Sequence, residues 1–253
     1  MLNPLARECA SRKTKALSKY TSTLHVLANW YSVDSNPILV RVGKTKQAFY
    51  VHETLLRDSS DFFNNALKKE WKEGQEAAVD LPDAQPDDFR AWVKFLYTGR
   101  VYVGDASVGI TPRGPHGIYP EFMKWASYYA FGSFLCDDDF RDALIDAMID
   151  MIRSLEIFPR RLAQFIYPHT IHTSAHRKLA IDNFVNLWSR DRFGTDKEQP
   201  VDFLNDVLKA IGPNLAKGIA SVKASTWFNG MDPCKYHDHG DKPCYKTKPA
   251  FRF

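Results

Sequence analysis

Two cysteines and two histidines lie within eleven residues near the C-terminus, in the pattern Cys234-x2-His237-x-His239-x4-Cys244. Two thiolates and two imidazoles form the ligand set of a structural zinc site, and a bound metal can order a segment too short to bury a core. In an extended segment His237 and His239 share one side, and Gly240 can turn Cys244 back toward them. We therefore expect either a small zinc module or an unstructured polar tail, because Cys/His clusters are only compositional hints.

Basic and aromatic residues alternate in the same tail, an arrangement that can bind single-stranded nucleic acid through charge and stacking. The chain as a whole carries 34 Lys and Arg against 30 Asp and Glu, a net charge of +4 that is too small to indicate nucleic acid by itself. A nucleic-acid-associated regulator with a C-terminal zinc module is therefore kept as the second function class. The tail residues concerned are Lys242, Tyr245, Lys246, Lys248, Phe251, Arg252 and Phe253.

Catalytic motifs are incomplete wherever they begin. The Gly-Lys-Thr sequence at 43–45 would need a glycine five positions before Gly43 to form a phosphate loop, but Ile38 stands there. The His-Glu pair that starts at His52 would need a second histidine four residues on, where Leu56 is found. Cys136 precedes three aspartates that oppose thiolate formation, so we expect it to be a buried or capping residue. The sequence predicts no enzyme activity, and His52 is expected to be structural.

The composition is that of an ordinary globular protein. The chain has 253 residues, of which 44% are hydrophobic and 25% are charged, a length that fits one or two domains. No apolar run approaches the roughly 18 residues that span a bilayer, and the N-terminus lacks a secretory signal. We expect an intracellular protein of the cytoplasm or nucleus; the basic first twenty residues leave a mitochondrial transit peptide as the alternative.

The predicted secondary structure begins with a β-hairpin. Apolar, β-branched runs at 38–42 and 47–51 flank a turn sequence and predict two antiparallel strands. Apolar residues at three- and four-residue spacings over 55–67 surround a polar break and predict two short helices. A third strand is expected at 78–81. A helix over 86–98 should follow, with a proline in its first turn and Gly99 just past its end.

The second half of the chain is predicted to be mostly helical. Residues 100–120 are rich in glycine and proline and indicate a loop insertion, with one strand at 101–103. Helices are expected at 121–135 and at 203–211, together with one around residues 179–188. The clearest helix begins behind Asp137-Asp138-Asp139, with a buried face formed by Phe140, Ala143, Leu144, Ala147, Met148, Met151 and Ile152.

This order of elements, with the residues that it carries, resembles a BTB/POZ domain over residues 36–155. The resemblance implies an α+β fold, with a small sheet, a helical cluster and a mostly helical C-terminal extension. The C-terminal part is similar to that of a large group of fungal BTB proteins. The residues that carry the resemblance are Val42-Gly43, Phe49-x-x-His52, Leu55-Leu56, Ser59-Ser60-x-Phe62-Phe63, Leu81-Pro82-Asp83, Phe89 and Phe95-Leu96-Tyr97-Thr98-Gly99.

Four regions follow from this reading. We expect a basic, loosely ordered arm over 1–35, a BTB/POZ-like domain over 36–155, a helical region over 156–233 and the Cys/His-containing basic tail over 234–253.

The family resemblance also implies a function. BTB/POZ domains are protein-interaction modules that commonly self-associate, and some members are substrate adaptors for a cullin ubiquitin ligase. Trp71-Lys72-Glu73 falls where the cullin adaptors carry a hydrophobic-x-Glu motif, so Trp71 and Glu73 are the expected partner-binding residues. The alternative is an exposed helix end with an incidental glutamate. Pro37 and Glu53 replace an acidic and a basic residue of many members, which puts in doubt the charged groove of the transcriptional repressors.

Overall fold

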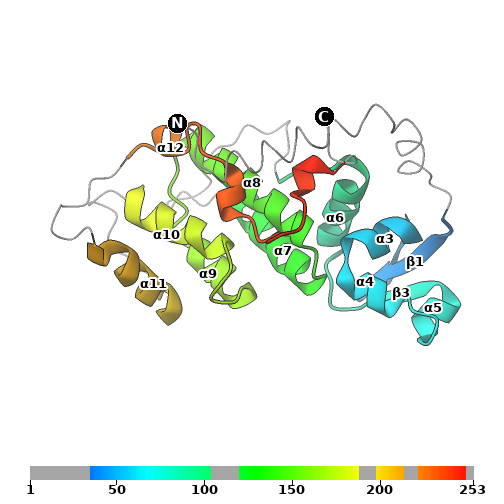
Figure 1. Cartoon of the computed structure of the whole chain (residues 1–253). Helices are drawn as coiled ribbons and strands as arrows, with labels where there is room; N and C mark the ends of the chain where they lie inside the picture. Colours follow the sequence, from blue (N-terminus) through cyan, green and yellow to red (C-terminus); the bar gives the residue numbers. More distant parts are fainter. Residues whose placement is uncertain (1–34, 104–119, 188–197, 214–221, 249–253) are drawn as a thin grey trace, which may run out of the picture. The chain divides into compact units, whose positions relative to one another are not determined.

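A computed structural model describes residues 35–103, 120–187, 198–213 and 222–248 of the chain. The chain divides into two compact units (Figure 1). The first comprises Met1–Ala143 with Asp241–Phe253, and the second comprises Leu144–Gly240. Among the helices in these described ranges, none combines the length and the apolar character needed to cross a membrane.

The first unit contains a three-stranded sheet in the order β2-β1-β3. Strand β1 (Pro37–Val42) pairs with β2 (Gln47–His52) in an antiparallel hairpin and with β3 (Ala78–Leu81) in parallel. Alternate residues of β1 are buried, as a strand with one face on the core requires. Gly43 takes a positive φ of 74° in the turn after β1. The predicted hairpin and third strand are therefore confirmed.

Two short helices follow the hairpin, as predicted: α3 (Glu53–Ser59) and α4 (Asp61–Ala66). Ser60 separates them because its side chain does two things at once. Its Oγ accepts a hydrogen bond from the backbone N–H of Phe63 at 3.2 Å, which caps α4, and donates to the carbonyl of Leu135 at 2.6 Å. This buried hydroxyl therefore fixes the start of α4 and ties it to the chain 75 residues further on.

The next two helices of this unit are α5 (Lys72–Glu76) and α6 (Pro86–Thr98). Proline opens α6, and Gly99 ends it with a φ of 66°, as the sequence predicted. The core lies between α4 and α6, where the Phe63 and Trp92 rings stack at 5.4 Å. Both of these side chains are fully buried.

Helices α7 (Pro120–Phe134) and α8 (Asp138–Leu155) confirm the two helices expected after the insertion. Cys136 is neither buried nor a cap: it is exposed, with a φ of 52° in the turn before α8. The capping group is Asp137, which is fully buried and whose Oδ1 accepts from the N–H of Phe140 at 2.9 Å. The cysteine prediction was wrong because the turn directs Asp137 inward instead.

The strand predicted at 101–103 does not form. β-branched residues favour an extended chain, but a strand also needs a neighbouring ladder, and the sheet described here consists of β1, β2 and β3. Residues 104–119 of the predicted insertion lie outside the described residues.

The second unit is helical. It contains α9 (Leu162–Ile166), α10 (His176–Asn186), α11 (Val201–Ile211) and α12 (Ala224–Trp227), with short 3-10 turns η2 (Tyr167–His169) and η5 (Pro233–Tyr236). Helices α10 and α11 confirm the predictions made for this region. Phe203 joins them to η2, because its ring makes edge contacts with Tyr167 at 5.4 Å and with Phe184 at 5.3 Å.

Candidate functional site

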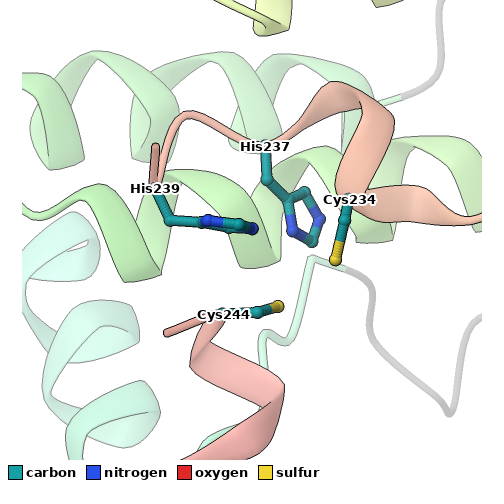
Figure 2. A group of neighbouring side chains, drawn as sticks. All are labelled: Cys234, His237, His239 and Cys244. Carbon is teal, nitrogen blue, oxygen red and sulfur yellow. The ribbon is translucent and has the colours of Figure 1, made fainter. Parts of the chain in front are cut away.

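The four predicted metal ligands converge (Figure 2). Each of Cys234, His237, His239 and Cys244 offers one ligand atom, and all four atoms lie within 4.8 Å of one another. Cys234 sits in η5, the two histidines follow in an extended segment, and Cys244 precedes the 3-10 turn η6 (Tyr245–Thr247). The structure thus brings together the whole set that the sequence proposed.

His237 is held by a carboxylate. Its ring is buried, and its Nε2 lies 3.1 Å from Oδ1 of Asp146 in α8. The carboxylate accepts a hydrogen bond from Nε2–H, so the lone pair of the neutral ring is on Nδ1. Metal-bound histidines characteristically donate their other ring N–H to a carboxylate or a carbonyl. His237 has the environment of a metal ligand that binds through Nδ1.

His239 has the complementary arrangement. Its Nδ1 lies 3.0 Å from the carbonyl oxygen of Gly240, which can only accept, so Nδ1 carries the proton. The other nitrogen, Nε2, is buried and has no hydrogen-bond partner within the described part of the chain. Leaving a polar atom buried without a partner costs about 1–3 kcal/mol. A ligand that accepts the Nε2 lone pair would remove this cost.

Cys234 and Cys244 do not form a disulfide, so each carries a thiol. Cys244 is only 1% exposed, and Cys234 is half-buried. The side chain of Asp232 accepts a hydrogen bond from the backbone N–H of Cys234 at 3.0 Å and so caps η5. This cap fixes the backbone position of Cys234. Two thiols and two imidazoles that face one another in this way match the Cys2His2 donor set of structural zinc.

The residues between the ligands anchor the segment to α10. Tyr236 is fully buried and donates to Asp182 at 2.9 Å, and burial, the largest effect, together with this neighbouring carboxylate raises the pKa of the phenol. Asp238 accepts from the hydroxyl of Ser174 and from the backbone N–H of Ala175, both at 2.5 Å. The interpretation of an unstructured polar tail is wrong for residues 234–248, because these polar side chains find partners and become ordered.

The basic and aromatic residues of the tail are engaged within the first unit. Lys248 pairs with Asp139, and Lys242 lies 3.8 Å from Asp138. Tyr245 is buried, and its ring centroid lies 6.4 Å from that of Phe95. These contacts give the alternating pattern an internal role and add no support for a nucleic-acid surface. The Nζ of Lys246 lies 5.8 Å from the ring centroid of Tyr245, and the last three members, Phe251, Arg252 and Phe253, lie outside the described residues.

The predicted partner-binding residues lie on the surface of the first unit. Trp71 immediately precedes α5 and is 60% exposed, and Glu73 in the first turn of α5 is also exposed. The carboxylate of Glu73 pairs with no cation of the described chain. Gly74 holds the turn close, because a Cβ there would lie 2.2 Å from the carbonyl oxygen of Lys68. The two side chains are therefore displayed by a compact turn.

The sheet and the helices α3 to α6 lie within a region that matches a known family. Residues 37–111 match the family model of the BTB/POZ domain. The chain contains a BTB/POZ domain. Its small sheet with surrounding helices, followed by further helices, confirms the predicted α+β fold. The BTB/POZ domain is a protein-interaction module, and this sets the class of function to consider first.

Inside the BTB/POZ domain, the residues that had catalytic alternatives have structural roles. The Nδ1 of His52 lies 2.5 Å from the hydroxyl oxygen of Tyr97, at the junction of β2 and α3. The Gly-Lys-Thr residues at 43–45 form the turn between β1 and β2, and a strand follows where a phosphate loop needs a helix. Glu53, one of the two departures from the family pattern, pairs with Arg57 at 2.6 Å.

The partners of the metal-ligand segment were not predicted. Asp146, Asp182 and Asp238 hold it, and each is a polar residue whose sequence position looks like an ordinary solvent-exposed one. The one sequence feature that could have indicated these contacts is the position of Asp238 between two candidate ligands. A polar residue that alternates with ligands in an extended segment points to the opposite side and can bind the supporting element there.

Proposed function

We propose that this BTB/POZ protein is a non-enzymatic interaction protein that recruits a cullin scaffold through Trp71 and Glu73 and so acts as a ubiquitin-ligase substrate adaptor. The observation that carries the proposal is the exposure of Trp71. Trp92 and Trp125 of the same unit are fully buried, whereas Trp71 is 60% exposed. Tryptophan is enriched among the residues that dominate binding at protein interfaces.

The neighbouring carboxylate supports the same surface. Glu73 lies two residues from Trp71 in the turn that Gly74 keeps compact, and its side chain has no ion-pair partner in the described chain. An aromatic anchor supplies buried area at an interface, and an adjacent carboxylate fixes the register against a donor of the partner. This combination is why we favour a docking role over an incidental helix end.

Self-association belongs to the same proposal, because the family commonly dimerises. The basic arm over 1–35 is the segment that we propose contributes to a homo-oligomer. The helical region and the tail after residue 155 are then available to bind the protein that is to be ubiquitinated. A cullin partner implies an intracellular location, in the cytoplasm or the nucleus.

The test is size-exclusion chromatography with light scattering of the full chain, alone and mixed with the N-terminal region of a cullin. We expect co-elution that Trp71→Ala weakens by at least 30-fold in Kd, corresponding to about 2 kcal/mol. Glu73→Ala should weaken it as well. Tyr50→Ala, at another highly exposed aromatic of the BTB/POZ domain, and Glu70→Ala, at an exposed glutamate one residue before Trp71, are the matched controls.

The possible results separate the parts of the proposal. No co-elution of the folded wild type with a panel of cullins would overturn the adaptor role. Equal affinity of the wild type and Trp71→Ala would show that this surface is not the interface. The mass of the protein alone reports self-association, and an unchanged mass after removal of residues 1–34 would exclude the arm from it.

A further inference from the structure

We propose that Cys234, His237, His239 and Cys244 bind one zinc ion in a closed, tetrahedral site. The donor atoms are the two sulfur atoms, Nδ1 of His237 and Nε2 of His239. This inference is independent of the proposed cullin-binding surface, which consists of Trp71, just before α5, and Glu73 within α5. The argument rests on the convergence of the four donors and on the hydrogen-bond partners of the two imidazoles.

The geometry needs only a small adjustment to hold the ion. Zinc–sulfur and zinc–nitrogen bonds of about 2.3 and 2.0–2.1 Å place tetrahedral ligands roughly 3.3–3.8 Å apart. The four donor atoms already lie within 4.8 Å of one another. Side-chain rotations that shorten the longest separation by about 1 Å complete the sphere, so the backbone of the segment can stay where its anchors hold it.

The hydrogen bonds of the two imidazoles leave one nitrogen of each ring able to bind a metal. The Asp146 carboxylate accepts from Nε2 of His237, and the Gly240 carbonyl accepts from Nδ1 of His239. Each contact selects the tautomer whose lone pair is on the opposite nitrogen. The buried Nε2 of His239 lacks a hydrogen-bond partner in the described residues and requires one. These are independent signs of a ligand, beyond the clustering of residue types.

The charge of the site also suits zinc. Cys234 and Cys244 bind as thiolates and release their protons, so two negative charges balance the ion and the imidazoles stay neutral. A Cys2His2 set fills all four positions and leaves none open for water or substrate. The site therefore has a structural role, stabilising residues 234–244 rather than supplying catalysis.

The first experiment measures the metal in the full-length protein, purified under reducing conditions from zinc-supplemented cells. We expect close to one zinc per chain by elemental analysis. Cys234→Ser and His239→Asn should each lower the zinc content at least tenfold under the same dialysis. Cys136→Ser removes an exposed thiol outside the cluster and should retain full zinc content, which makes it the matched control.

A second measurement reports the ligand geometry directly. Replacement of zinc by Co²⁺ should give the intense visible bands of tetrahedral cobalt together with thiolate-to-metal charge transfer, and Cys234→Ser should reduce the latter. Asp146→Asn should leave the stoichiometry at saturating metal unchanged but weaken affinity by 10–100-fold, because an amide positions the imidazole less well than a carboxylate. This separates a positioning residue from a ligand.

Three results would overturn the proposal. One is a folded wild type that binds neither zinc nor cobalt. Another is equal metal content in the wild type, Cys234→Ser and His239→Asn. The third is a Cys234–Cys244 disulfide found by mass spectrometry in reductant-treated protein, since the two sulfurs cannot serve both purposes. If a ligand variant does not fold, the wild-type stoichiometry and cobalt spectrum still decide the question.

Discussion

The indole Nε1 of Trp92 donates a hydrogen bond to Oδ2 of Asp137 at 2.7 Å, and both side chains are fully buried. The same carboxylate accepts from the hydroxyl of Ser59 at 2.5 Å and from the backbone N–H of Phe140. One aspartate thus joins the end of α3, the middle of α6 and the start of α8. It explains why a serine stands at 59 and why a tryptophan, rather than another apolar residue, stands at 92.

This aspartate should make stability depend on pH. Burial outweighs its hydrogen bonds and raises the pKa of Asp137 to about 6. The folded state therefore binds this proton more tightly than the unfolded state, and the free energy of unfolding should fall as pH rises from about 4 to about 6. The loss from this group is at most roughly 3 kcal/mol.

Denaturant titrations of the wild type and Asp137→Asn at matched pH values check this expectation. The contributions of the other groups cancel in the difference between the two proteins, so the difference in unfolding free energy should change across the window. An amide has one acceptor oxygen where the carboxylate has two, so its NH2 group must face the N–H of either Trp92 or Phe140, and the variant should be less stable than the wild type throughout. Two parallel pH profiles would contradict the role assigned to Asp137.

Ser60→Ala should destabilise the BTB/POZ domain by about 2 kcal/mol. The substitution removes the cap of α4 and leaves the Leu135 carbonyl without the donor that now reaches it at 2.6 Å. Thermal unfolding of the wild type and the variant measures the loss. Ser154→Ala, at an exposed position late in α8, is the control and should change stability by less than about 0.5 kcal/mol. A Ser60→Ala protein as stable as this control would be inconsistent with the cap.

Gly74→Ala should disturb the turn that displays Trp71 while leaving the core folded. The added Cβ would lie 2.2 Å from the carbonyl oxygen of Lys68 and 2.7 Å from that of Leu67, so the backbone must shift, at a cost of about 1–3 kcal/mol. We expect weaker partner binding with near-native circular dichroism. Unchanged binding would show that partner binding does not depend on the conformation of this turn.

Metal removal should expose the C-terminal segment to protease. Chelation takes away the metal that holds residues 234–244, so trypsin should cleave after Lys235 and after Lys246, just beyond the last ligand, faster than in the zinc-loaded protein. Mass spectrometry of the digest identifies the sites, and chelator already saturated with zinc is the control. Cleavage at equal rates in both samples would mean that the segment owes its order to Tyr236 and Asp238 alone.

Local patterns predicted much of the fold. The apolar, β-branched runs at 38–42 and 47–51 on either side of a turn sequence predicted the hairpin. The three- and four-residue spacings predicted α3, α4 and α8, because they show which side of a helix is buried, and the proline and glycine at its two ends predicted α6. The prediction of a strand at 101–103 was wrong because a strand needs a neighbouring strand to pair with, and that depends on contacts far away in the sequence. The prediction that Cys136 is buried or caps a helix was wrong because Cys136 takes a left-handed backbone conformation, which leaves its side chain exposed and buries that of Asp137 instead.

The ligand set of the metal site was predicted because its members are close in sequence. Its supporting contacts were not, since Asp146 lies 91 residues from His237 and Asp182 lies 54 residues from Tyr236. Acidic residues on helices are usually solvated, and sequence alone does not distinguish those that fold back onto a distant segment. The exposure of Trp71 likewise depends on the packing of the whole domain.

The return of residues 241–248 to the first unit has a consequence for synthesis. Asp139 is translated 109 residues before Lys248, the residue with which it pairs. Phe95 is likewise translated long before Tyr245, whose ring packs near it. A nascent chain can therefore form the BTB/POZ sheet early, but part of its core stays uncovered until the rest of the chain has been translated. Until then Phe95 stays accessible to chaperones that bind exposed apolar surface.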